Sequence, residues 1–155
     1  MLDIARFVSG IVQTYAAHEG PTVTVVFSDQ TMGGGLLVRG RDGPLGQVIR
    51  NLIDNARSFS PDGGEVRVSL HQVAIGAQTT ARLIVDDDGP GIPEDKRDKI
   101  FDRFYTDRPD GAAFGNNSGL GLSIVKQIIG THLGTVEAQT REEGGARFIV
   151  DLPAE

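Results

Sequence analysis

Three stretches of the chain repeat their apolar residues at intervals of three and four, and each predicts an amphipathic helix. The first covers residues 2–18, the second covers 44–59, and the third opens at 118–122 and runs to about residue 133. Pro44 suits the first turn of the second helix, because a proline there removes no intrahelical hydrogen bond. The apolar arc of this helix is bordered by four polar residues, Gln47, Asn51, Asn55 and Ser58.

Six shorter stretches alternate between apolar and polar residues or are rich in β-branched residues, which predicts β-strands. They are residues 22–28, 36–39, 65–73, 80–87, 135–140 and 147–152. We expect the third and fourth to form an antiparallel pair joined by a loose loop of Ala, Gly and Gln, and the last two to form a hairpin. Residues 106–118 have no periodic pattern and are rich in Asp, Gly, Asn and Pro, which predicts a mobile loop.

These elements predict an α+β fold: a two-layer α/β sandwich with a mixed, mainly antiparallel sheet and three main helices on one face. No internal repeat or second domain is visible, so residues 1–155 are expected to form a single domain. The net charge of -6 argues against a nucleic-acid partner held by bulk electrostatics. The absence of cysteine excludes disulfides and thiolate metal sites, and no apolar run approaches the length of a membrane span.

The first candidate for chemistry is the stretch at residues 83–92, where a short apolar run ends in three aspartates and a Gly89-Pro90-Gly91 turn. A carboxylate is costly to bury at a strand end unless a donor faces it, and an adenine amino group is one such donor. The glycines would let a flat base approach the backbone. Taken alone, a solvated acidic turn without a ligand explains this stretch equally well.

Two further candidates concern phosphate and metal. Asn51 and Asn55 are four residues apart, so they project from one helix face, and an amide oxygen suits Mg2+. Gly119 and Gly121 stand at the expected start of the third helix, where free N–H groups and the helix dipole favour phosphate. In isolation the asparagines are better explained as a solvated pair, and the glycines as a tight turn.

In this order and spacing the motifs resemble the ATP-binding catalytic domain of bacterial sensor histidine kinases, within the Bergerat-type ATPase superfamily. The resemblance covers residues 45–153. Its motifs are residues 47–56 (N box), 87–92 (G1), 101–105 (F box), 119–122 (G2) and 144–148 (a G3-like closing stretch). It departs from the family at Gln47, where Glu or His is frequent, at Ser58, where Lys or Arg is common, and at Ala146, where Thr or Ser is common.

The resemblance implies that Asp87 accepts a hydrogen bond from adenine, that Asn55 supplies an oxygen to Mg2+ with Asn51 nearby, and that residues 106–118 form a lid. Catalytic roles would fall to Gln47 and Asn51. The implied nucleotide-contacting residues are Asn51, Asn55, Arg57, Ser58, Phe59, Asp87, Gly89, Gly91, Ile92, Ile100, Arg103, Tyr105, Arg108, Ser118, Gly119, Leu120, Gly121 and Leu122. Among these, Arg103 and Arg108 are the candidates for a phosphate-facing cation.

The resemblance also implies partners: ATP, Mg2+, a histidine-bearing dimerisation domain of the same parent protein, and a response regulator. It places the chain in the cytoplasmic portion of a larger inner-membrane sensor, and we expect the fragment itself to be monomeric. His18, His71 and His132 lack the sequence setting of a phosphoacceptor. Two alternatives remain open at this point: a free-standing serine kinase of the anti-sigma type, and a non-catalytic, ATP-gated interaction module.

Overall fold

A five-stranded sheet forms one layer of the protein. The structure is a computed structural model and describes residues 1–16, 23–31, 35–102 and 121–155. The strands lie in the order β2 (Thr24–Asp29), β4 (Glu65–Ile75), β5 (Gln78–Asp86), β7 (Ala146–Pro153) and β6 (Thr135–Thr140). β2 pairs in parallel with β4, and the other three pairings are antiparallel. The predicted mixed, mainly antiparallel sheet is therefore confirmed.

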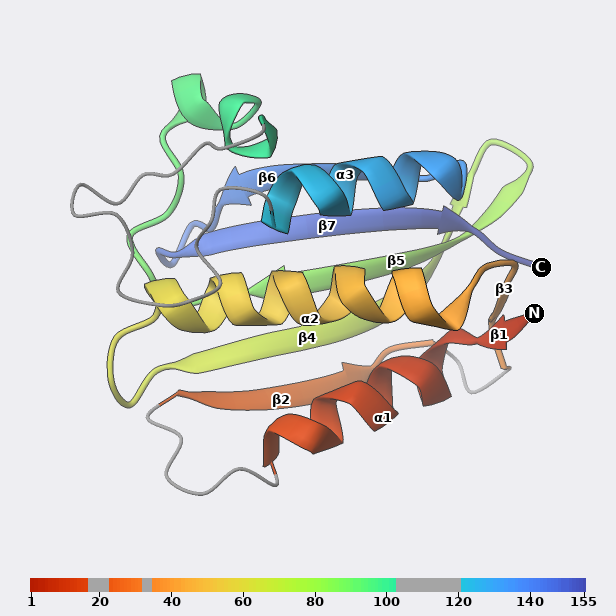
Figure 1. The fold of residues 1–155 in the computed structure, drawn as a ribbon, viewed down its shortest axis with the longest axis horizontal. Helices are drawn as coiled ribbons and strands as arrows, with labels where there is room; N and C mark the ends of the chain where they lie inside the picture. Colours follow the sequence, from red (N-terminus) through yellow and green to blue (C-terminus); the bar gives the residue numbers. More distant parts are fainter. Residues whose placement is uncertain (17–22, 32–34, 103–120) are drawn as a thin grey trace.

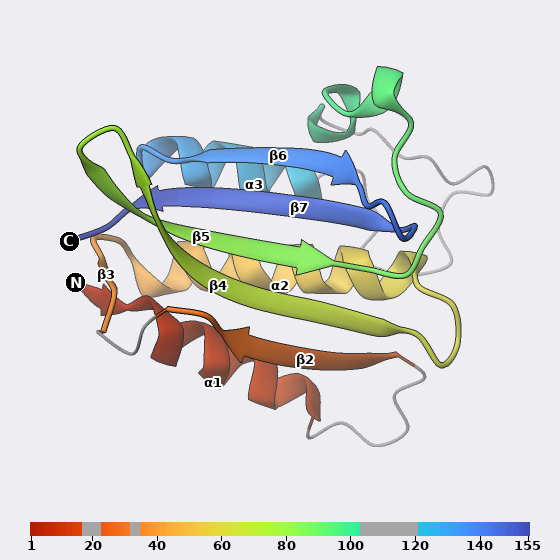
Figure 2. The ribbon, with the colours of Figure 1, turned by 180° about the vertical axis from the view of Figure 1, so that it is seen from behind.

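Three helices form the second layer: α1 (Ile4–Ala16), α2 (Asp42–Phe59) and α3 (Gly121–Thr131). They lie side by side on one face of the sheet (Figure 1), and the view from behind shows the opposite face without a helix in the described chain (Figure 2). Two short 3-10 turns, η1 (Glu94–Lys96) and η2 (Lys99–Phe101), follow β5, and η2 packs against α3. In the part of the chain described here, no helix is long and apolar enough to cross a membrane.

The alternation in the strands explains why only one face is covered. On β4 the alternate residues Val66, Val68 and Leu70 are buried against the helices. The intervening positions of the sheet carry charged pairs instead. In one of them, Arg82 Nε lies 2.8 Å from Asp151 Oδ1. An antiparallel sheet commonly has one apolar and one solvated face, and this sequence provides both.

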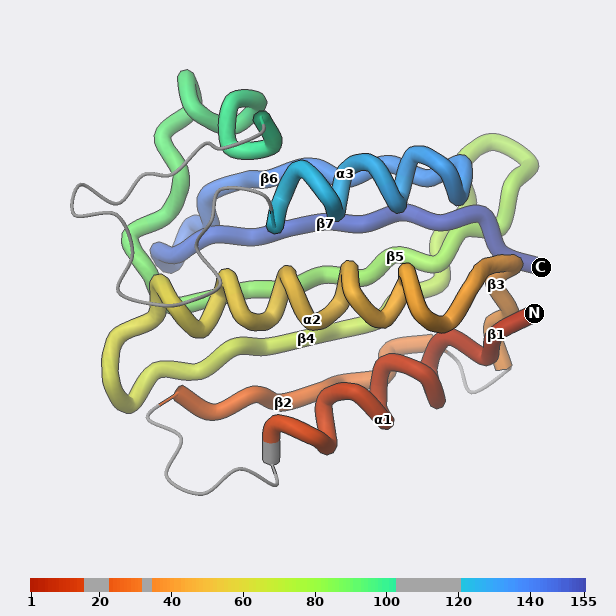
Figure 3. The backbone as a smooth tube through the Cα atoms, in the orientation of Figure 1, coloured from red at the N-terminus to blue at the C-terminus, as the bar shows by residue number. Residues whose placement is uncertain are grey.

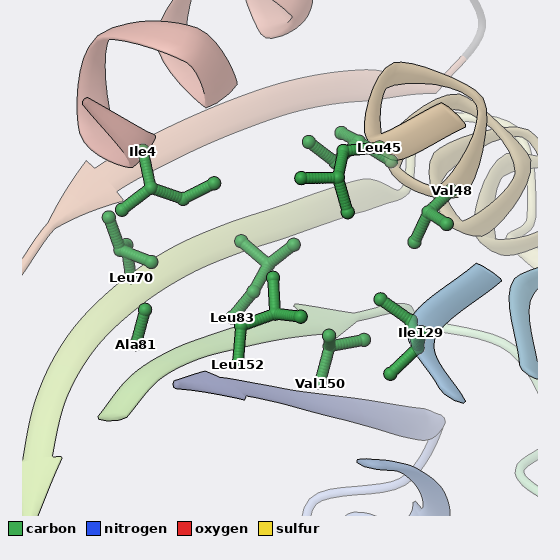
Figure 4. Close-up of a pocket in the computed structure, with 10 residues that line it drawn as sticks. Ile4, Leu45, Val48, Leu70, Ala81, Leu83, Ile129, Val150 and Leu152 are labelled. Carbon is green, nitrogen blue, oxygen red and sulfur yellow. The ribbon is translucent and has the colours of Figure 1, made fainter. Parts of the chain in front are cut away.

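Between the two layers of the described chain the core contains a small apolar cavity of about 10 Å³. Ile4, Leu45, Val48 and Ile129 line it from the helices, and strand residues close it from below (Figure 4). A space of this size holds at most one water molecule, and a lining of apolar side chains gives that water no hydrogen-bond partner. The cavity is therefore a packing defect of the core and not a ligand site.

The structure corrects two local predictions. Residues 2 and 3 are not helical: they form β1 (Leu2–Asp3), which pairs with β3 (Leu37–Val38), and Val38 also bridges Ala154 near the C-terminus. The prediction of a loose loop between the third and fourth predicted strands is also wrong. β4 and β5 continue to a two-residue turn, because Gly76 adopts a φ of 61° that a tight hairpin turn needs. The smooth backbone trace shows this long hairpin projecting beyond the sheet (Figure 3).

Candidate functional site

The three consecutive aspartates at the end of β5 point in different directions because side chains alternate along a strand. Asp86 lies on the open face of the sheet, where Arg147 donates two hydrogen bonds to it, at 2.7 and 2.9 Å. Asp88 accepts a 2.7 Å hydrogen bond from Arg67 and a second from the backbone N–H that begins β4. Asp87 is 1% exposed and lies among the residues beneath the helices. Asp86 is also buried, under arginine side chains on the open face, so Asp87 is the aspartate of the three that lies on the face covered by the helices.

The carboxylate of Asp87 is held by backbone groups. Its Oδ1 accepts hydrogen bonds from the N–H of Gly89 (2.8 Å) and of Ala146 (3.0 Å), while its own N–H donates to the Ala146 carbonyl (3.0 Å). Burial raises the pKa of Asp87, the two N–H donors oppose this rise, the Asp88 charge adds to it, and the Arg141 charge opposes it. Within the described chain, both hydrogen bonds end on Oδ1, so Oδ2 is left without a protein donor.

The glycine turn after the aspartates is clamped from two sides. A Cβ on Gly89 would lie 2.7 Å from the carbonyl oxygen of Phe59, the last residue of α2, so the turn rests directly on that helix end. Gly91 has a φ of 87°, and a Cβ there would lie 2.8 Å from the Thr140 methyl group. Thr140 Oγ1 also accepts from the Ile92 N–H (3.0 Å) and donates to the Ile92 carbonyl (2.8 Å). Both positions of the turn therefore require glycine, because a side chain there would overlap atoms of Phe59 or Thr140.

The turn between β6 and β7 completes this end of the site. Arg141 donates to the carbonyl oxygens of Asp87 (3.0 Å) and Gly144 (3.2 Å), and its side chain is only 12% exposed. Gly145 has a φ of 90°, and a Cβ there would overlap the Asp87 carbonyl oxygen. The closing turn thus lies in direct contact with the backbone of the buried aspartate.

A second group of polar residues lies where α2 meets α3. Asn51 donates from Nδ2 to the carbonyl of Gly121, the first residue of α3, at 3.2 Å. Asn55 is half-buried one turn further along α2, and the Ser58 hydroxyl donates to the Asn55 carbonyl at 2.7 Å. No group of three or more His, Asp or Glu that could hold a metal occurs among the described residues. The oxygens that Asn51 and Asn55 offer here are those of neutral amide groups.

Comparison with known proteins shows which protein family has this arrangement of buried aspartate, glycine turn and paired asparagines. The family described as histidine kinase-, DNA gyrase B-, and HSP90-like ATPase matches residues 40–155. The chain belongs to this ATPase family. It is the ATP-binding catalytic module for which the family is named, which confirms the resemblance found in the sequence.

Relatives of this ATPase module are sensor histidine kinases. The chain is 47% identical over 124 residues to sensor protein ChvG of Rhizobium meliloti (strain 1021), which covers 76% of the chain and 21% of that protein. The catalytic domain of histidine kinase ThkA matches with a TM-score of 0.79 at 27% identity, covering 98% of this chain and 93% of that one. ShkA, solved at full length with AMPPNP, matches with a TM-score of 0.75 at 25% identity over 99% of this chain and 30% of that one. The chain spans about a fifth of the length of the ChvG proteins it matches.

The ATPase module brings some of the predicted site residues together. Asp87, Gly89 and Phe59 meet at the end of α2, and Asn51 meets Gly121 at the start of α3. Gly91 and Ile92 lie in the same clamped turn, and Leu122 is half-buried in the first turn of α3.

Other predicted residues of the module have different surroundings. Gln47 is exposed one turn before Asn51, and Ile100 is buried in the core at η2. Arg57 points toward α1, where its guanidinium lies 5.2 Å from the centre of the Tyr15 ring. The candidates Arg103, Tyr105, Arg108, Ser118, Gly119 and Leu120, and the predicted lid at 106–118, lie outside the described residues.

Two residues of the ATPase module were not singled out from the sequence: Thr140, which holds the turn at Ile92, and Arg141, which holds the Asp87 carbonyl. Ala146 was named only as a departure from the family, and its backbone contact with Asp87 was not foreseen. The register of β5 with β7 pairs Asp86 with Arg147, which puts Ala146 opposite Asp87. That register is the signal that could have found them, but it becomes visible only once the strand order is known.

Proposed function

We propose that the chain is the catalytic domain of a longer sensor histidine kinase, which binds Mg-ATP and presents the γ-phosphate to a histidine of a separate dimerisation domain. A response regulator would then receive the phosphoryl group. The observation that carries this proposal is the buried Asp87 carboxylate, whose Oδ1 is occupied by backbone donors while Oδ2 is not. The names of the relatives favour histidine as the target over the anti-sigma-type serine kinase and over a non-catalytic module.

The adenine end of the proposed site follows from the chemistry of Asp87. An ionised carboxylate only accepts hydrogen bonds, so Oδ2 selects a base with a donor at its edge. Adenine presents an amino group there, whereas guanine and hypoxanthine present an oxygen. Gly89 and Gly91 let the turn pack closely against Phe59 and Thr140, and the turn would in this way form a wall beside the base. Phe59 ends α2 beside this turn and would contact the ring.

The phosphate end of the proposed site lies further back along α2. Asn51 precedes Phe59 by eight positions, which corresponds to about 12 Å along a helix axis. This separation suits a nucleoside triphosphate that lies along the helix with its base at Phe59. The N-terminus of α3, an 11-residue helix, carries the partial positive charge that favours phosphate oxygens.

The residues at this end fit a magnesium ion that arrives with the nucleotide. Asn51 and Asn55 offer neutral amide oxygens, and Mg2+ usually takes its remaining ligands from water and phosphate. When bound, the ion neutralises phosphate charge during transfer. The described residues place no carboxylate cluster here, so the negative charge that balances the ion would come from the phosphates. Asn55, one turn closer to the base than Asn51, is the proposed protein ligand.

Transfer itself would depend on positioning. The imidazole of the partner domain attacks the γ-phosphorus in line, the bond from that phosphorus to the bridging oxygen breaks, and ADP leaves. Gln47 is exposed next to the asparagines and can orient the imidazole by accepting its N–H, but it cannot take up a proton. The chain would act on the cytoplasmic side of its parent sensor, where ATP is available.

Calorimetry with AMP-PNP tests the binding half of the proposal. We expect binding that strengthens with Mg2+, and Asn55→Ala should remove the Mg2+-dependent part while leaving binding without the metal unchanged. Incubation with labelled ATP and a separate histidine-bearing helical domain tests the transfer half. Label on a serine, or no label after confirmed ATP binding, would refute histidine transfer, and undetectable binding at millimolar AMP-PNP would refute the nucleotide site.

A further inference from the structure

Arg141 is the first residue after β6, and its guanidinium lies beneath the run of three aspartates. Its Nη1 donates to the carbonyl oxygens of Asp87 at 3.0 Å and Gly144 at 3.2 Å. Its nitrogens lie 3.6 Å from a carboxylate oxygen of Asp88 and 3.9 Å from one of Asp86. With 12% of its side chain exposed, this is the most enclosed of the cations that contact the run.

Charge pairing explains only one end of this guanidinium: Nη2 donates to Glu143 in the same turn at 3.0 Å, and that pair does not account for the contacts of Nη1 at the aspartate run. Asp86 already has a two-bond partner in Arg147, and Asp88 has a 2.7 Å partner in Arg67. Two hydrogen bonds of Arg141 go to backbone carbonyls: that of Asp87 in the aspartate run and that of Gly144 in the turn between β6 and β7. Its long-range charge nevertheless acts on the buried carboxylate between those two aspartates.

These contacts hold Asp87 on the same side as Ala146, because the Asp87 carbonyl faces Gly145, the residue that precedes Ala146. The N–H and carboxylate of Asp87 engage Ala146, and the carbonyl of Asp87 engages Arg141, so the whole residue is held between β7 and the closing turn. The direction of the Asp87 side chain is therefore set by both neighbours. A rotation of its peptide plane would turn Oδ2 away from the place where a base would lie.

We propose that Arg141 is a positioning residue for base recognition: it holds the Asp87 backbone so that Oδ2 accepts from an adenine amino group. This inference rests on the proposed nucleotide site. Arg141 does not contact the base in this proposal and acts only through Asp87. Its role is thus to make the site choose an amino group over an oxygen at the base edge.

The ionisation state gives the proposal a measurable signature. Burial raises the pKa of Asp87, and the positive charge of Arg141 opposes that rise. A protonated carboxyl would direct a donor at the adenine amino group, so ATP affinity should fall as the pH falls through the pKa of Asp87. Removing the Arg141 charge should move that fall to higher pH.

The test compares Arg141→Gln with Arg147→Gln, which removes the same charge from the same aspartate run but from a side chain that contacts Asp86. Dissociation constants for ATP and inosine triphosphate, which has an oxygen in place of the amino group, are measured with Mg2+ across a pH series. We expect Arg141→Gln to weaken ATP by about tenfold or more with little change for inosine triphosphate, so that the preference for ATP shrinks. Arg147→Gln should keep the wild-type preference and the wild-type pH midpoint.

Arg141→Lys separates charge from geometry. It should restore the pH midpoint, because it keeps the charge, but recover the ATP preference only in part, because an ammonium cannot copy the guanidinium fork. It also carries the test if Arg141→Gln does not fold, since the partial loss of preference is then the required result. An unchanged preference in the Arg141 variant tested, or an equal loss in Arg147→Gln, overturns the proposal. If the wild type fails to prefer ATP, the proposed nucleotide site itself is wrong.

Discussion

Replacing Asp87 with Asn separates nucleotide binding from stability. Asn has nearly the same shape, and its oxygen can still accept the two backbone N–H bonds that end on Oδ1. The position of Oδ2 then carries an NH₂ group, which donates and cannot accept. An adenine amino group would meet a second donor there.

The magnitude of the binding loss follows from these two changes. Losing a hydrogen bond to a charged acceptor costs about 1.5–3 kcal/mol, and facing one donor with another leaves a further desolvated group unpaired, at about 1–3 kcal/mol. A combined loss of about 3 kcal/mol or more corresponds to a dissociation constant raised by about 100-fold or more. Calorimetry with AMP-PNP measures this directly.

Stability should respond in the opposite sense. Because burial raises the pKa of Asp87 above its ordinary value of 3.8, the fold binds this proton more tightly than the unfolded chain does. The ionised Asp87 therefore lowers stability at pH values above its folded pKa, and the cost disappears as the pH falls below 3.8. Asn carries no such cost, so the free energy of unfolding in urea at neutral pH should be unchanged or higher.

Asp86→Asn is the matched control, since it makes the same chemical change one residue earlier. It weakens the partly exposed pair with Arg147, so we expect about 1 kcal/mol or less of lost stability and unchanged AMP-PNP affinity. The reasoning is refuted if Asp87→Asn binds AMP-PNP like the wild type. It is equally refuted if Asp86→Asn loses affinity to the same degree.

Three further changes test the surroundings of the site. Gly145→Ala should lower the free energy of unfolding by about 2 kcal/mol or more, because its Cβ would overlap the Asp87 carbonyl oxygen. Gly144→Ala is the control: it has open space around it and should cost about 1 kcal/mol. Equal losses of stability in urea titrations of the two variants would contradict the overlap. The Arg67 guanidinium holds the pKa of Asp88 below 3.8, so the pair stabilises above pH 3.8 and is lost as the pH falls through the lower, folded pKa. Arg67→Gln should flatten this part of an acid-unfolding curve, and an unaltered curve would exclude the pair as its cause. Asn51→Ala removes the bond to the first residue of α3, and we expect urea titration to show a loss of about 1 kcal/mol rather than none.

The sheet and the main helices were predictable because their patterns are long and local. The alternation of Val66, Val68 and Leu70 marks β4, and the three-four spacing in α2 marks a buried helix face. The two-residue strands β1 and β3 were not predictable, because two residues are too few to show a period. The β4–β5 turn was misjudged because the last strand residues, such as Ile75, are exposed and continue the pairing through backbone bonds alone.

The candidate site also has parts that a local sequence pattern reveals and parts that depend on contacts between distant residues. The acidic glycine turn was predictable because carboxylates after an apolar run are a local signal. The sequence placed three equivalent aspartates there, and the prediction of Asp87 came from family resemblance rather than from the pleat. The role of Arg141 depends on a contact with a residue 54 positions earlier, which no local pattern reveals.

Val38 contacts both ends of the described chain, since its backbone pairs with Leu2 and forms a β-bridge with Ala154. Both termini therefore meet at one end of the molecule, while β5 runs to the other end before the aspartates (Figure 1). Nine residues of β-strand span about 30 Å. A pull on either terminus would therefore act first on the pairings of Val38, which the length of β5 separates from the aspartates.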